Sequence, residues 1–197
     1  MGVTGGYNLS TPSRYDSKSG FHVGVKGELG LPQVAKGMYA DFGLLLSSHG
    51  WKQPSYYYNA DYVGATGGNQ IAQYSRWDCT PYYLSIPIHW GYKFSVGRHV
   101  GLFVNAGPYF NIGLFGKTKE TVTPNGGKET EHTRVNNVFS DKVMKRFDWG
   151  VGLRVGIEVA RHIQIAAGYD WGLKKAGKGI DYNYKNRTFT VSCSYMF

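Results

Sequence analysis

Apolar and polar residues alternate with a period of two along most of the chain, and segment 148–159 shows this most clearly. Its odd positions carry Trp149 followed by five aliphatic residues, whereas its even positions carry glycine, aspartate, arginine and glutamate. Successive side chains of a strand point to opposite faces, so a strand separates these two sets and a helix would mix them. The pattern predicts a β-strand with one apolar and one polar face.

Seven further segments alternate in the same way. They comprise residues 82–94, 100–115 and 188–197, with weaker alternation at 3–9, 21–31, 38–47 and 163–171. No segment of the sequence offers an amphipathic helix, and no run approaches the roughly 18 apolar residues that a transmembrane helix needs. The sequence therefore predicts an all-β protein whose residues 1–197 form a single domain of eight strands.

The connections between these segments alternate in length. Three are short, at Pro32–Gly37, Ser95–His99 and Ala160–His162, and four are longer, at Ser10–Gly20, Ser48–Asp78, Lys117–Lys145 and Lys174–Lys185. Outer-membrane barrels have short periplasmic turns and long external loops. The fold predicted is an eight-stranded antiparallel up-and-down transmembrane β-barrel, with its apolar face turned to lipid and four loops presented outside.

The polar faces of these segments favour a lumen over a water-covered outer surface. They are rich in glycine, which would be an odd coat for a soluble protein but leaves space in the narrow interior of an eight-stranded barrel. Charges in such an interior must be paired or hydrated. We expect ion pairs that plug the lumen, in a polar network of Lys26, Glu28, Asp41, His89, Asn105, Arg154 and Glu158.

Aromatic residues gather at both ends of the apolar face. Amphipathic rings prefer the headgroup layer of a membrane, so two clusters at opposite strand ends indicate two girdles. The girdle residues predicted are Trp90, Tyr92, Phe94, Tyr195 and Phe197 towards the short turns, and Trp149, Tyr169 and Trp171 towards the long loops.

Two stretches and the last strand carry a family resemblance. The stretches are Tyr83–Phe94 and Asn105–Phe110, and the last strand alternates up to Phe197. The chain resembles the porin-like outer membrane protein beta-barrel domain family from Gly2 to Phe197, and its architecture is similar to the OmpX and OmpA barrels. The resemblance implies the Gram-negative outer membrane and insertion by its assembly machinery through the C-terminal strand. It implies no catalytic motif.

The start of the chain and its two cysteines add two expectations. Met1–Tyr7 shows neither a basic nor an apolar leader region, so we expect an exported protein whose signal peptide is absent from this sequence. Cys79 and Cys193 show no metal-binding or redox spacing and are expected to be free thiols.

The formal net charge of +9 permits an anionic partner, although the mean hydropathy of −0.36 by itself would suit a soluble protein. Lipopolysaccharide phosphates would lie at the long-loop rim, and lysine and arginine bind phosphate well. The alternative is that these loop charges are merely solvated. Nucleic acid is discounted because the aromatic residues belong to the lipid face. The possible contacts are Lys117, Lys119, Lys145, Arg146, Lys174, Lys175, Lys185 and Arg187.

No strong catalytic constellation is visible. Ser47, Ser48 and His49 at one strand end, and His132 in the third long loop, are unspecific candidates for a nucleophile and a base. The spacing of His22, His49 and His132 supports no metal site, and no cofactor is expected. The leading hypothesis is a non-enzymatic barrel whose loops contact lipopolysaccharide, host surfaces or partner proteins. A small lipid A-modifying enzyme and a narrow channel remain the alternatives.

Overall fold

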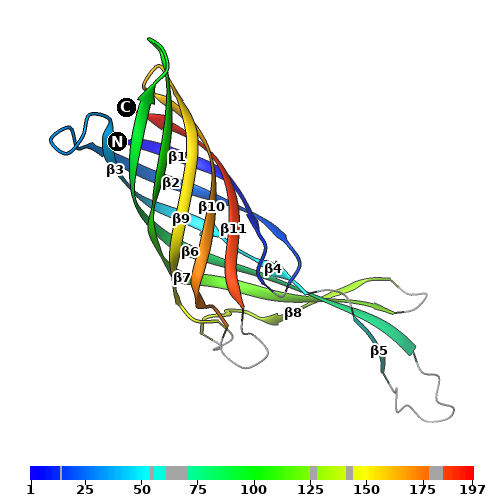
Figure 1. The fold of residues 1–197 in the computed structure, drawn as a ribbon. Helices are drawn as coiled ribbons and strands as arrows, with labels where there is room; N and C mark the ends of the chain where they lie inside the picture. The colour runs from blue at the N-terminus through cyan, green and yellow to red at the C-terminus, as the bar shows by residue number, and fades with distance from the viewer. Residues whose placement is uncertain (14, 54–55, 61–70, 125–127, 141–143, 178–183) are drawn as a thin grey trace, which may run out of the picture.

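The computed structural model describes residues 1–197 except 14, 54–55, 61–70, 125–127, 141–143 and 178–183. The regular elements of the described residues are all β-strands, and among these residues no helix is long and apolar enough to cross a membrane. Eight strands form a ring (Figure 1). They are β1 (Gly2–Ser10), β2 (Lys18–Gly30), β3 (Met38–Ser48), β6 (Ile71–Ser95), β7 (Val100–Pro124), β9 (Phe147–Val159), β10 (Ile163–Lys175) and β11 (Lys185–Met196).

Antiparallel pairing between sequence neighbours runs around the whole ring, and β11 pairs with β1 to close it. The β1–β11 register begins with Gly2 opposite Met196 and ends with Ser10 opposite Thr188, so β1 is bonded along its full length. Both termini lie at the rim of the short turns (Figure 1). The structure confirms the all-β, eight-stranded antiparallel barrel predicted from the alternation.

The apolar face of each strand is the outer one. In β9 the outward residues Trp149, Val151, Leu153, Val155 and Ile157 are 39–52% exposed, whereas Asp148, Gly150 and Gly152 on the other face are buried. A band of exposed aliphatic and aromatic side chains around the whole cylinder is typical of a surface covered by hydrocarbon.

Two of the predicted loops are wrong in part, because they contain strands. β6 begins at Ile71 and β7 continues to Pro124, so this hairpin extends well beyond the predicted segments 82–94 and 100–115. Three short strands accompany it: β4 (Trp51–Lys52) and β5 (Tyr56–Ala60) pair with β6, and β8 (Thr130–Val135) pairs with β7. Outside the membrane no apolar face is needed, so these strands lack the alternation that identified the others.

β5 and β8, with the outer ends of β6 and β7 to which they pair, form what we call the β5–β8 extension. It projects away from the barrel at the end opposite the termini (Figure 1). Glu120 joins its strands, because it accepts hydrogen bonds from the Ser75 hydroxyl, at 2.6 Å, and from Arg134 of β8. Burial raises the pKa of the Glu120 carboxyl, but these two hydrogen bonds outweigh burial and hold that pKa below its ordinary value. An ion pair between Lys119 and Glu131 also links β7 to β8.

The tightest turn, between β9 and β10, uses an unusual backbone conformation. Ala160 and Arg161 both have positive φ, 51° and 63°, and the His162 amide donates to the Val159 carbonyl at 3.1 Å. Residues with a β-carbon rarely adopt this left-handed region, but two such residues in succession match the twist of a two-stranded hairpin. The geometry keeps this connection short.

Inside the barrel, glycine makes room for one large cation. Arg154 of β9 forms a two-armed ion pair with Asp170 of β10, with nitrogen–oxygen distances of 2.7 and 3.0 Å. A β-carbon added at Gly168 would lie 2.3 Å from Arg154 Cδ, which is impossible without displacing the guanidinium. The absence of a side chain at Gly168 on the polar face therefore provides the space that Arg154 occupies.

We expect Gly168→Ala to weaken the Arg154–Asp170 pair and lower the free energy of unfolding by about 1.5–3 kcal/mol, the range for a hydrogen bond to a charged group. The measurement is urea unfolding of the barrel in lipid vesicles, followed by tryptophan fluorescence.

Gly5→Ala is the matched control. A β-carbon at Gly5 would meet only the His22 carbonyl oxygen, at an ordinary 3.7 Å, so this variant should unfold at the urea concentration of the wild type. Equal stability of the two variants would contradict the role given to Gly168.

Candidate functional site

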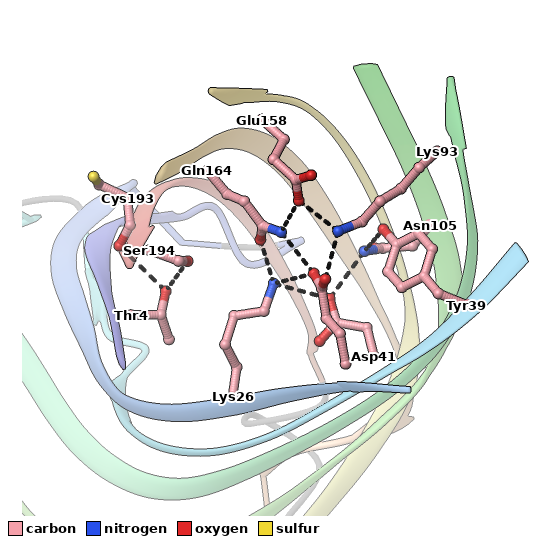
Figure 2. A network of polar contacts seen from close by, with 11 residues as sticks. Thr4, Lys26, Tyr39, Asp41, Lys93, Asn105, Glu158, Gln164, Cys193 and Ser194 are labelled. Carbon is pink, nitrogen blue, oxygen red and sulfur yellow. Dashed lines mark hydrogen bonds and ion pairs between the residues drawn. The ribbon is translucent and has the colours of Figure 1, made fainter. Parts of the chain in front are cut away.

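Charged and polar side chains meet inside the barrel near the short-turn end (Figure 2). Lys26 Nζ lies 3.2 Å from Asp41 Oδ2, 3.3 Å from Glu28 Oε1 and 2.8 Å from Gln164 Oε1. Lys93 forms ion pairs with both Glu28 and Glu158. The network joins strands β2, β3, β6, β9 and β10 across the lumen, so it ties opposite walls of the barrel together.

Gln164 and Asn105 bridge the charges of this network (Figure 2). The Gln164 amide donates to Glu28 at 2.8 Å and to Glu158 at 2.7 Å, and the Asn105 amide donates to Asp41 and to the Tyr39 hydroxyl, each at 3.0 Å. The structure places all seven residues of the predicted lumen network on the inner face. Sequence reasoning omitted Lys93 from that network, although Lys93 shares the polar face of its strand with His89.

A cavity of about 90 Å³ lies in the middle of the lumen. Four buried side-chain atoms at its lining have no hydrogen-bond partner among the described residues: Ser85 Oγ, His89 Nε2, Asn105 Oδ1 and Asn111 Oδ1. A polar cavity of this size has room for several water molecules, which have the donors and acceptors that such groups need.

The Ser47–His49 pair expected as a weak catalytic candidate does form, but it faces this cavity. Ser47 Oγ lies 2.8 Å from His49 Nε2, and His49 Nδ1 lies 3.1 Å from the Thr188 hydroxyl. Both residues are buried inside the barrel, away from the lipid surface. Ser48 Oγ accepts a hydrogen bond from the Phe21 amide, and His132 is exposed on β8. The four candidates therefore make no common site.

Apolar side chains of the outer connections form a second cluster, which we call the outer cap. Its buried members are Trp51, Cys79, Tyr83, Val138, Phe139, Met144, Ala176 and Tyr184, with Tyr15, Trp77 and Val135 packed against them. All four outer connections contribute to it. Tyr15 stacks on Trp51 with ring centroids 4.4 Å apart, and Phe139 meets Tyr83 at 5.4 Å.

The outer cap sits directly on the lumen. Tyr83 is an inward residue of β6, and its ring lies 5.7 Å from the His49 ring at the cavity. Sequence reasoning missed the cap because its members have no periodic spacing. The available signal was the presence of Trp51, Phe139 and Tyr184 in the predicted outer connections.

The predicted basic residues lie along the outer rim in three places. Lys175, Lys185 and Arg187 are exposed on β10 and β11, where Lys175 lies opposite Lys185 and Arg187 lies opposite Trp171. Lys145 and Arg146 precede Phe147 in the chain, and Lys174 Nζ lies 4.7 Å from the centre of the Phe147 ring. Lys117 and Lys119 are exposed on β7.

The structure places the predicted girdle residues on the outer surface. Near the short turns Trp90, Phe94, Tyr195 and Phe197 are about half exposed or more, with Tyr92 somewhat less. Towards the long loops Trp149 and Trp171 are exposed and Tyr169 is half-buried. Over the described part of the chain, no group of three or more histidine, cysteine, aspartate or glutamate side chains could hold a metal ion, and Cys79 and Cys193 are free thiols.

Comparison with known proteins shows the family to which this barrel belongs. The family model of the outer membrane protein beta-barrel domain matches residues 1–178, and no curated protein sequence matches the chain. Similar solved structures include Ail, the attachment invasion locus protein of Yersinia pestis, which is 13% identical and aligns over 100% of this chain and 97% of its own, with a TM-score of 0.35.

Two further solved structures align over the whole of this chain. Neisserial surface protein A is 13% identical over 96% of its own length, with a TM-score of 0.43. The N-terminal β-barrel domain of Pseudomonas aeruginosa OprF is 12% identical over 100% of its own length, with a TM-score of 0.32. Because the family model covers nine tenths of the sequence, the chain belongs to the outer membrane protein beta-barrel domain family, and its location is the bacterial outer membrane.

Proposed function

We propose that this protein is a closed, non-conducting surface barrel whose outer rim binds the phosphates of lipopolysaccharide and whose β5–β8 extension is presented for contacts outside the cell. The observation that carries the proposal is the placement of Lys175, Lys185 and Arg187. Their side chains are exposed at the outer ends of β10 and β11, where Lys175 follows Trp171 and Leu173, and Arg187 and Lys185 lie beyond Phe189.

The chemistry of this position suits phosphate. Lys175, Lys185 and Arg187 form no ion pair with the described residues, so their charges are available to a ligand. Lys145 and Arg146 lie beside these three cations along the outer rim. The Lys145 backbone amide donates to the carbonyl of Ala176, the residue that follows the end of β10. Cations at a membrane interface attract anionic headgroups.

Side chains at both ends of the lumen support the proposal that it is closed. The Lys26–Glu28–Lys93 network fills the short-turn half, and the outer cap covers the other end with Tyr83 and Phe139. The interior of an eight-stranded barrel is only wide enough for side chains. The Ser47–His49 pair gives no support to a lipid-modifying enzyme, because both side chains are turned away from lipid.

The double variant Lys185→Gln/Arg187→Gln tests the lipopolysaccharide proposal. Each lysine or arginine near an anionic membrane surface contributes about 1 kcal/mol, so the two changes together should weaken binding of bisphosphorylated lipid A roughly tenfold or more. The measurement is a titration of the barrel in zwitterionic nanodiscs with lipid A.

Arg76→Gln/Lys128→Gln removes the same charge from exposed positions on or near the extension, away from the lipid wall. This control should bind lipid A as the wild type does. If both double variants weaken binding equally, the effect is one of net charge and the proposed phosphate site is wrong.

Planar-bilayer recording tests the closed lumen. The wild-type barrel is expected to show no steady openings in molar potassium chloride, because side chains fill its interior at both ends. Reproducible unitary conductance from the purified, folded barrel would contradict closure and favour a narrow channel.

A further inference from the structure

The lipid-facing wall has a notch where β1 meets β11. Gly5 lies directly opposite Cys193, so a position without a side chain faces one with a small side chain. A groove on the outer surface is lined at this place by Val3, Val23, Ile163, Cys193 and Tyr195 as well as Gly5. Thr4 and Ser194 also line the groove, but their side chains are buried and line the lumen cavity, so the exposed lining is almost entirely apolar.

The strand register defines the shape of this notch. Gly5 and Cys193 are flanked in their own row by Val23 on β2 and Ile165 on β10. The row nearer the short turns carries Val3 and Tyr195, and the row beyond carries Tyr7 and Val191. Larger side chains therefore surround the notch on every side, and most of them are between 41% and 51% exposed.

Packing within the protein does not demand glycine at this position. Gly168 is needed because Arg154 occupies the space of a β-carbon, but a β-carbon at Gly5 would have no contact closer than 3.7 Å and Gly5 lacks a positive φ. The small residues at positions 5 and 193 leave space outside the wall, where only hydrocarbon is present.

The short-turn rim of the barrel, towards which the notch lies, carries basic residues. Each of the three short turns carries one exposed cation, Lys36, Arg98 or Arg161, and none carries an acidic residue. The nearby acids Glu28 and Glu158 face the lumen, where Lys93 pairs with both.

Arg161 is the cation next to the notch. It lies two residues before Ile163, which lines the groove, and the neighbouring His162 ring stacks on Tyr195 at 5.9 Å. An apolar groove that ends at a basic turn matches an acyl chain that ends at a phosphate.

We propose that this notch is a specific site for one phospholipid of the periplasmic leaflet, with an acyl chain in the groove over Gly5 and Cys193 and the phosphate bound by Arg161. The site lies at the short-turn rim, whereas the proposed lipopolysaccharide contacts lie at the opposite rim. The two sites stand or fall independently.

Filling the notch tests the acyl-chain part. Native mass spectrometry of the folded barrel, released from detergent with dioleoylphosphatidylglycerol, should show one retained phospholipid on the wild type. Gly5→Leu should reduce that retained fraction roughly fivefold, because leucine takes the space and the contacts of the chain. Ala106→Leu, the same enlargement at another exposed outward position, should leave the fraction unchanged.

Removing the cation tests the phosphate part. Arg161→Asn should reduce the retained fraction about fivefold, the effect of one cation near a lipid headgroup. Asparagine is chosen because it tolerates the positive φ of this turn. Arg98→Gln removes the same charge from a different short turn and should have no effect.

Photo-crosslinking decides the outcome even if a variant folds poorly. A phosphatidylglycerol with a diazirine in its acyl chain should label the wild-type protein mainly at residues 3–5 and 193–195. Labelling spread evenly around the wall, or equal lipid retention by Gly5→Leu and Ala106→Leu, would show ordinary surrounding lipid and overturn the proposal.

Discussion

Hydrocarbon offers no hydrogen bonds, so every backbone amide and carbonyl that enters a bilayer needs a partner within the protein. This chain meets that constraint by pairing its first strand with its last: Gly2 lies opposite Met196 and Ser10 lies opposite Thr188. Without that pairing, β1 and β11 would each expose a row of unpaired groups to lipid. Closure fixes the two faces of every strand, with one set of side chains outside in lipid and the other inside in a narrow lumen.

The lumen inherits a strict requirement from this closure. An interior lined by eight strands has room for side chains and little water, so a charge placed there needs a partner. Lys26, Glu28 and Lys93 satisfy one another near the short turns, and Arg154 pairs with Asp170 in the space that Gly168 leaves. The outer cap lies at the other end, where Tyr83 joins it to the lumen.

The sequence allowed prediction of the membrane-spanning part, because lipid on one side and a crowded lumen on the other impose a period of two on segments such as 148–159. It did not allow prediction of the outer cap or of β8, since neither lipid nor a lumen imposes a pattern outside the membrane. Phe139 and Tyr184 belong to one cluster only because the folded chain brings their connections together. Sequence also suggested Ser47 and His49 as neighbours, but only the structure places them facing the lumen cavity.

The most direct test of this account is a nitroxide scan of residues 148–159 in lipid vesicles, one cysteine at a time in a variant lacking Cys79 and Cys193. Collision rates with oxygen, which partitions into hydrocarbon, are expected to peak at the odd positions such as 151, 153 and 155 and to fall at the even ones. High collision rates with a water-soluble nickel complex at those odd positions, or shielding of them from both reagents, would contradict a wall that faces lipid.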